Sequence, residues 1–344
     1  MSLHSLRRVL AALALLVVAV ALAACGSSNG DSGATATAPE KLDTLTLQGP
    51  ETTLALSLPF LRVAEGDALA RHAAKVAYKP WRNPDELRAR LASGQADVSA
   101  VPTYVGANLY NRGLDVRLVN VLVWGLLYVV GPDGKAVDWP QLRGETVLVP
   151  FKGDMPDLVF RRLAAENGLD PAKDLDIRYV SAPPEAVQML VGGQAPYAVL
   201  PEHIATVAIQ QGATHGKPLA RAMNLQEEWG AATGGEPRFP QAGILVSGEL
   251  ADDHPEVVAA LQRDLAASVD WINGSPGEAA QLAAEGIAGI QAPIAQQAIP
   301  NLNLRFATAA DARPELEAFF TELAELSPEI IGGELPDDGF YYKE

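Results

Sequence analysis

Short runs of aliphatic and β-branched residues alternate along this chain with longer segments in which apolar residues recur every three or four positions. The short runs predict β-strands at residues 45–48, 75–78, 97–101, 116–123, 126–130, 146–149, 176–180, 197–200 and 243–247. The longer segments predict amphipathic helices between most of these strands. Because strands that alternate with helices pair in parallel through right-handed crossovers, the pattern predicts an α/β fold.

Proline and small polar residues mark the first turns of several predicted helices. Helices are expected to begin near Asn83-Pro84, Pro156, Pro201 and Pro255. Ser275 and Glu278 have the spacing of a capping box, which predicts that another helix begins there. The last long helix is expected at about residues 313–326.

Residues 116–130 have strand character throughout except for one glycine, Gly125, near the middle. The segment is too long for one ordinary strand. We favour a chain that leaves one sheet and enters another, with Trp124 and Gly125 at the crossing. The alternative is a pair of antiparallel strands within a single sheet.

The N-terminus carries Arg7 and Arg8, followed by an apolar run from Val9 to Ala24. This run is shorter than the roughly 20 residues that span a bilayer, and it is typical of a secretory signal peptide. The sequence LAAC that ends at Cys25 resembles the lipobox of bacterial lipoproteins. We therefore expect residues 1–24 to be a signal peptide and Cys25 to be lipidated. Residues 26–41 are small and polar, so residues 25–41 are expected to form a lipidated, flexible tether.

Composition narrows the functional classes. Cys25 is the only cysteine, so the exported chain cannot form an internal disulfide. The net charge is −16, which argues against binding to nucleic acid or adhesion to anionic lipid. Roughly 300 residues follow the tether, which suggests two domains. With 48% of residues hydrophobic, a large core is available.

Five predicted strands end at or near a proline, namely those that precede Pro50, Pro80, Pro102, Pro150 and Pro201. Proline is expected to end the ladder of hydrogen bonds and fix the loop that follows. In open α/β sheets, ligands bind beyond the carboxyl ends of the strands. The candidate ligand-binding residues are therefore Gly49, Pro50, Glu51, Thr52, Thr53, Trp81, Pro102, Thr103, Tyr104, Trp124, Lys152, Gly153, Asp154, Met155, Pro201 and Glu202.

Catalytic motifs are missing from the sequence. It contains no HExxH, no CxxC, no Gly-x-Ser-x-Gly and no phosphate-binding loop. His203 follows a predicted helix start, where a lone histidine is expected to be a surface or capping residue. We therefore predict no catalytic residue, no metal site and no cofactor.

The candidate residues leave the charge of a ligand open. The rings of Trp81, Tyr104 and Trp124 suit a flat or partly apolar molecule. Lys79, Arg82 and Lys152 would suit an anion, whereas Glu51 would suit an amine.

Several stretches of the chain resemble one protein family. They are LQGP at 47–50, VPTYVGANLYN at 101–111, GLLYVV at 125–130, LRGETV at 142–147, ENGLDP at 166–171, YAVLPE at 197–202 and GGELPDDGFYY at 332–342. Together with the lipobox, these stretches resemble the solute-binding lipoproteins of bacterial ABC importers. Within that family, the chain looks like the branch of alkanesulfonate-, taurine-, nitrate- and thiamine-precursor-binding proteins.

The resemblance implies a type II periplasmic-binding-protein fold with two lobes, each a mostly parallel sheet flanked by helices. Lobe I would hold residues 42–123 and about 246–344, and lobe II would hold residues 124–245. A monomer, exported to the periplasm or outer cell surface, would bind a small organic solute between the lobes. Its partners would be a permease, an ATPase and the membrane that holds its lipid. Trp124, where an aliphatic residue is common, and the charged Glu51 depart from the family pattern.

Two other functions remain open. The same fold occurs in enzymes that resemble chorismate dehydratases or thiamine-pyrimidine synthases, so the fold alone does not exclude catalysis. Export argues against cytosolic biosynthesis, and the chain lacks the cysteine cluster of the second enzyme class. A ligand sensor for a surface receptor is the third function to consider.

Overall fold

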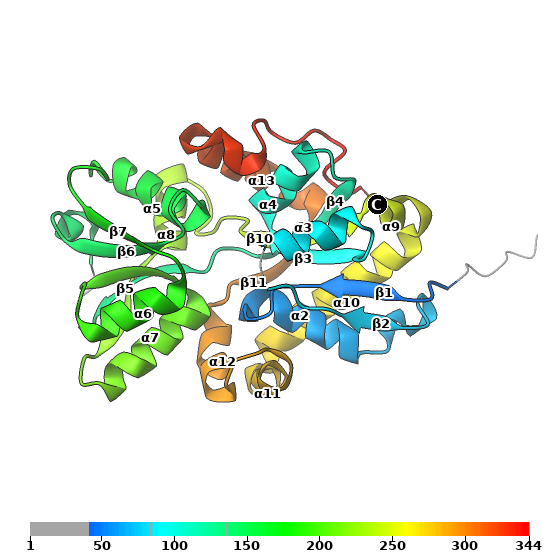
Figure 1. Ribbon diagram of the computed structural model, residues 1–344, viewed down its shortest axis with the longest axis horizontal. Helices are drawn as coiled ribbons and strands as arrows, with labels where there is room; N and C mark the ends of the chain where they lie inside the picture. The colour runs from blue at the N-terminus through cyan, green and yellow to red at the C-terminus, as the bar shows by residue number, and fades with distance from the viewer. Residues whose placement is uncertain (1–40, 83, 135–136, 344) are drawn as a thin grey trace, which may run out of the picture. The chain divides into compact units, whose positions relative to one another are not determined.

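Two β-sheets organise the chain in the computed structural model, which describes residues 41–82, 84–134 and 137–343 (Figure 1). The predicted signal peptide, Cys25 and all of the tether except Lys41 lie outside the described residues, as does the predicted helix cap Asn83. Residues 41–344 form one compact unit. No helix among the described residues has both the length and the apolar character needed to cross a membrane.

The first sheet has six strands, and we call this sheet with its helices lobe I. Its strands are β1 (Leu45–Gln48), β2 (Val76–Tyr78), β3 (Val98–Pro102), β4 (Val116–Val123), β10 (Ala242–Ser247) and β11 (Leu304–Thr308). Their order across the sheet is β11-β4-β10-β3-β1-β2. β1 runs parallel to β2 and β3, whereas β10 runs antiparallel to β3 and β4.

The second sheet has five strands and forms the centre of lobe II. Its strands are β5 (Leu127–Pro132), β6 (Thr146–Pro150), β7 (Asp176–Val180), β8 (Tyr197–Pro201) and β9 (Leu219–Asn224). Their order is β7-β6-β8-β5-β9. β6 runs parallel to β7 and β8, whereas β5 runs antiparallel to β8 and β9.

The predicted α/β two-lobed fold is confirmed, but both sheets are mixed rather than mostly parallel. The antiparallel pairs involve strands next to the crossings between lobes. β4 leaves lobe I, β5 enters lobe II, and β10 returns to lobe I between β3 and β4. β10 runs against both of its neighbours, and alternation in the sequence does not reveal that direction.

The chain crosses between the lobes at residues 124–126, because β4 and β5 belong to different sheets. This agrees with the crossing that we favoured for residues 116–130. The return comes earlier than the predicted boundary near residue 246. β10 already lies in lobe I at Ala242, which pairs with Pro102 and Val123.

Helices flank both sheets. They are α2 (Leu54–Glu65), α3 (Pro84–Ala92), α4 (Thr103–Asn111), α5 (Met155–Glu166), α6 (Pro183–Gly192), α7 (Glu202–Thr214), α8 (Leu225–Thr233), α9 (Gly248–Asp253), α10 (Pro255–Gly274), α11 (Pro276–Gly286), α12 (Ala292–Ala298) and α13 (Ala309–Leu326). Short 3₁₀ turns are η1 (Ala68–Arg71), η2 (Trp139–Leu142), η3 (Ile299–Asn301) and η4 (Pro328–Ile331).

Prolines mark helix starts as predicted, but two predicted details are wrong. Ser275 forms no side-chain cap, because it directly follows α10 and its ψ of 57° is not the extended conformation of a cap residue. α13 begins at Ala309, before the predicted residue 313, since the Thr308 side chain accepts a hydrogen bond from the Asp311 N–H and caps the helix there.

One apolar cluster extends from lobe I into lobe II. It includes Leu118 of β4 and Phe319 of α13 in lobe I, and Phe160 of α5 in lobe II. Trp229 of α8 contacts Phe319 edge to face, with ring centroids 5.5 Å apart. The two lobes therefore share a buried hydrophobic seam on the side where α5 and α8 meet α13.

Candidate functional site

The loop after β1 extends the sheet beyond the point where Pro50 was expected to end it. Trp81 N–H donates to the Gly49 carbonyl oxygen at 2.8 Å, and Glu51 N–H donates to the Trp81 carbonyl oxygen at 2.9 Å. Proline is tolerated between these bonds because its missing N–H faces away from the ladder. Gly49 and Pro50 are buried, while Thr52 is exposed and Thr53 precedes α2 without a side-chain cap. The paired loops therefore fix Trp81 beside Glu51.

Trp81 is partly buried and packs against the apolar cluster that crosses between the lobes. Its indole nitrogen Nε1 is buried and has no hydrogen-bond partner among the described residues. A buried donor without an acceptor costs about 1–3 kcal/mol. An acceptor supplied by a bound molecule would remove that cost.

The first turn of α4, directly after β3, brings one side chain to lobe II. Pro102 pairs with Ala242, and Thr103 Oγ1 donates to the Pro240 carbonyl oxygen at 2.6 Å, so both residues are held within lobe I. Tyr104 is buried, and its hydroxyl donates to Asp154 Oδ1 of lobe II at 2.7 Å. Burial, together with the Asp154 charge, raises the pKa of Tyr104 well above its usual value, so the phenol stays protonated and remains a donor.

The loop after β6 faces Tyr104 from lobe II. Asp154 caps α5, because its Oδ1 also accepts the Met155 N–H at 2.8 Å. Gly153 N–H donates to Asp157 Oδ2 at 2.8 Å. The Lys152 ammonium lies 5.2 Å from the centre of the Tyr179 ring. Met155 is buried in the shared apolar cluster.

Glu202 follows Pro201 and lies fully buried at the start of α7. Arg221 Nε donates to Glu202 Oε2 at 2.6 Å, and Thr206 Oγ1 donates to Glu202 Oε1 at 2.7 Å. Burial raises the pKa of Glu202, although the Arg221 guanidinium opposes that shift. The carboxylate therefore joins α7 to β9 inside lobe II.

Trp124 anchors the crossing between the lobes. It is buried, and its Nε1 donates to the Arg305 carbonyl oxygen at 2.8 Å. The Arg238 guanidinium lies 4.6 Å from the centre of the Trp124 ring and forms a bidentate ion pair with Glu315 of α13. Arg238 was not among the residues predicted from the sequence. Its one usable sequence feature is its place in the irregular segment that leads into β10.

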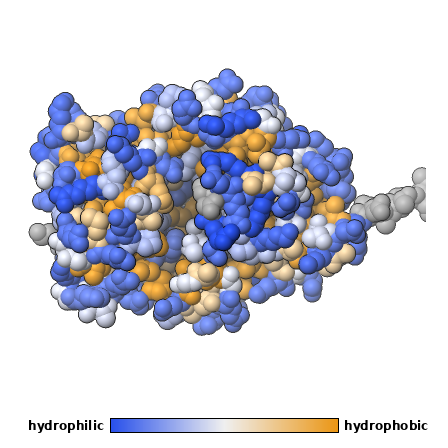
Figure 2. Space-filling view, viewed as in Figure 1, coloured by the Kyte–Doolittle hydropathy of each residue, from blue (hydrophilic) through white to orange (hydrophobic). Residues whose placement is uncertain are grey.

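The structure brings several predicted residues together. Tyr104, Trp124 and Met155 belong to one buried cluster, Trp81 packs against it, and Asp154 is hydrogen-bonded to Tyr104. Figure 2 shows that this face of the molecule is hollowed between the lobe that carries α5 and α6 and the lobe that carries α3. The strand-end loops of both sheets therefore supply residues to the seam between the lobes.

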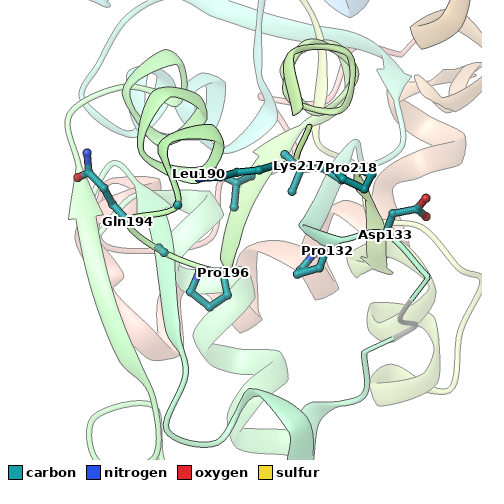
Figure 3. A pocket seen from close by; sticks show the side chains of 10 residues that line it. Pro132, Asp133, Leu190, Gln194, Pro196, Lys217 and Pro218 are labelled. Atoms are coloured by element: carbon teal, nitrogen blue, oxygen red, sulfur yellow. The ribbon is translucent and has the colours of Figure 1, made fainter. Parts of the chain in front are cut away.

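Another hollow, of about 500 Å³, lies in lobe II (Figure 3). It is lined by Pro132, Asp133, Leu190, Gly193, Gln194, Ala195, Pro196, Lys217, Pro218 and Leu219. Pro196 precedes the first residue of β8, whereas Pro201 and Glu202 lie at the other end of that strand. None of the predicted binding residues lines this hollow.

His203 differs from its expected surface or capping position. It is buried, and burial lowers its pKa to about 4. Within the described part of the chain, no three His, Cys, Asp or Glu residues are grouped so that they could hold a metal ion.

Residues 98–288 match the model of the NMT1-like family, a match that covers more than half of the chain. The chain belongs to the NMT1-like family. This NMT1-like chain is also 25% identical, over 177 residues, to the nitrate/nitrite binding protein NrtA of Synechococcus elongatus. That alignment covers 50% of the chain but only 36% of NrtA.

Solved structures support the predicted fold of this NMT1-like chain. An ABC transporter protein from Parabacteroides distasonis has a TM-score of 0.74 at 22% identity, covering 88% of this chain and 99% of that one. The periplasmic aliphatic sulphonate binding protein SsuA of Escherichia coli has a TM-score of 0.66 at 12% identity, covering 88% and 92%. These likenesses confirm the two-lobed periplasmic-binding-protein fold and agree with the resemblance found in the sequence.

Proposed function

We propose that this chain captures a small organic solute between lobe I and lobe II and delivers it to the permease and ATPase of an ABC importer. The solute would lie among the strand-end loops that supply Trp81, Tyr104, Asp154 and Met155. Binding would hold the lobes together, because one molecule would contact residues of both. The protein would act as a monomer and would not transform the solute.

The hydrogen bond between Tyr104 and Asp154 carries this proposal. It joins the first turn of α4, directly after β3 in lobe I, to the loop after β6 in lobe II. Both segments follow the carboxyl ends of their strands, which is where open α/β sheets bind ligands. NrtA and SsuA are binding proteins, which favours binding over catalysis.

Native mass spectrometry of protein purified without denaturation tests the proposal. We expect a bound solute of small mass to remain with the wild-type chain, because a closed cleft releases its ligand slowly. The Trp81→Ala variant should be found without bound solute. Trp271→Ala is the control: it removes an indole that packs beside Arg62, and this variant should keep the bound solute. Detection of a converted product after incubation with the released solute would contradict the proposal and favour an enzyme.

We also propose that Cys25 carries a lipid that holds the exported protein on a membrane. Residues 26–41 would then let the lobes move away from that surface. Intact-mass analysis of the membrane fraction should find a chain that begins at an acylated Cys25, and Cys25→Ala should move the protein to the soluble fraction. An unmodified Cys25 in membrane-bound protein would contradict the anchor.

A further inference from the structure

We propose that the solute carries a positively charged amine and that Asp154 is the residue that recognises it. This inference rests on the proposed function, because it names the chemistry of the molecule held at that site. The sequence left two alternatives open, with Lys79, Arg82 and Lys152 suited to an anion and Glu51 suited to an amine. The contacts of these side chains favour the amine.

The cations that could have held an anion are engaged or lie at the surface. Arg82 Nε lies 3.3 Å from Glu86 Oε2, and the Arg82 side chain is 72% exposed. Lys152 is exposed and lies over the Tyr179 ring. Lys79 is exposed and follows β2, the edge strand of its sheet.

The negative charge of Asp154 has no cationic partner in the described part of the chain. Its Oδ1 accepts from two neutral donors, the Tyr104 hydroxyl and the Met155 N–H. The residue is only partly buried, and within the described part of the chain its second oxygen, Oδ2, accepts no hydrogen bond. A carboxylate held in a fixed orientation by two donors is suited to an ammonium group, since charge-assisted hydrogen bonds are stronger than neutral ones.

Two N–H groups at the start of α5 are already taken by carboxylates of the protein. A free helix N-terminus attracts anions through its unpaired N–H groups and its dipole. Here Asp154 and Asp157 accept the N–H groups of Met155 and Gly153, so the protein supplies its own carboxylates. An incoming oxyanion would find these two donors occupied and would meet the charge of Asp154, whereas Arg161 Nε lies 3.3 Å from Asp157 Oδ1 and balances the charge of Asp157.

Trp81 completes the expected chemistry. It packs against the apolar cluster that also contains Tyr104 and Met155, which favours a solute with an apolar or aromatic part. Aromatic faces attract cations, as Arg238 over the Trp124 ring illustrates in this same protein. The buried Trp81 Nε1 lacks an acceptor among the described residues, which favours a solute that also carries a hydrogen-bond acceptor.

A thermal-shift screen with charge-matched probes tests this inference on the full chain. The probes are benzylamine, tyramine and putrescine as cations, benzyl alcohol as a neutral molecule, and benzenesulfonate, methanesulfonate and nitrate as anions. We expect a cation to raise the melting temperature and the anions to leave it unchanged. Asp154→Asn keeps the helix cap and removes the charge, so it should weaken cation binding by about 10- to 100-fold, the range for a hydrogen bond to a charged group.

Asp138→Asn is the matched control. Asp138 also precedes a helical turn in lobe II and accepts a hydrogen bond from the Gln141 N–H, but it is exposed. The Asp138→Asn variant should bind the cation as tightly as the wild type does. If only an anion or only benzyl alcohol stabilised the protein, the proposal of an amine solute would be wrong, whereas the proposed solute-binding function would still hold. If no probe stabilises the protein and native mass spectrometry finds no bound solute, both proposals fail.

Discussion

His203 gives the most direct prediction at the scale of a single residue. Burial lowers its pKa to about 4, so the folded protein holds the neutral ring while the unfolded chain binds a proton near pH 6.5. The contribution of neutral His203 to the free energy of unfolding is therefore fully present above pH 6.5, and it is lost as the pH falls towards 4. The loss should approach about 3 kcal/mol over this window.

Chemical denaturation at several pH values measures this loss. His203→Leu should lessen the fall in unfolding free energy between pH 7 and pH 4. Equal pH dependence in the wild type and His203→Leu would show that His203 titrates normally in the folded protein.

Single residues also show where sequence reasoning stops. Tyr104, Asp154 and Met155 could be selected because each lies just beyond a recognisable strand. The roles of Glu202 and Trp124 could not be selected in this way, because their partners come from distant segments. Arg221 pairs with Glu202, and the Arg305 carbonyl oxygen accepts from Trp124. Periodicity identifies elements, but it does not identify which elements become neighbours.

Gly125 makes the segment between β4 and β5 the most sensitive connection at the scale of elements. Its φ is +90°, and an added Cβ would lie 2.3 Å from Gln226 Cγ. Gln226 cannot move freely, because its Oε1 accepts the Leu127 N–H at 2.8 Å. Gly125→Ala should therefore destabilise the protein by about 2–3 kcal/mol.

Gly134→Ala provides the comparison for Gly125. Gly134 has a φ of +78°, but an added Cβ would have no neighbour within 4 Å. Gly134→Ala should therefore lower the unfolding free energy only by the cost of backbone strain, about 1 kcal/mol. Urea denaturation of the two variants measures the difference between their unfolding free energies. Equal losses would mean that the Gln226 side chain moves aside at little cost.

Two strands could not be predicted from the local pattern. β9 has the sequence LARAMN, and β11 has the sequence LRFAT; both lack a run of β-branched residues. They become strands because β5 and β4 offer them open edges. Local sequence therefore predicted the strands with strong intrinsic preference, and tertiary pairing supplied the others.

The two lobes of residues 41–344 meet along one seam with two kinds of contact. Apolar rings and the Arg162–Glu322 ion pair join α5 and α8 to α13, with Nε and Oε2 2.6 Å apart. Polar contacts also cross between the lobes, because the Tyr104 hydroxyl donates to Asp154 at the start of α5 and the Tyr128 hydroxyl donates to the Asn301 carbonyl oxygen at 3.2 Å. The apolar contacts should stay together while the Tyr104–Asp154 contact opens and closes around a solute.

Small-angle X-ray scattering of the full chain tests this central claim most directly. The radius of gyration should be measured before and after addition of the solute that copurifies with the protein. The radius of gyration of the wild type should become smaller with solute, and that of Trp81→Ala should not change. An unchanged radius with saturating solute bound to the wild type would contradict a cleft that closes between two lobes.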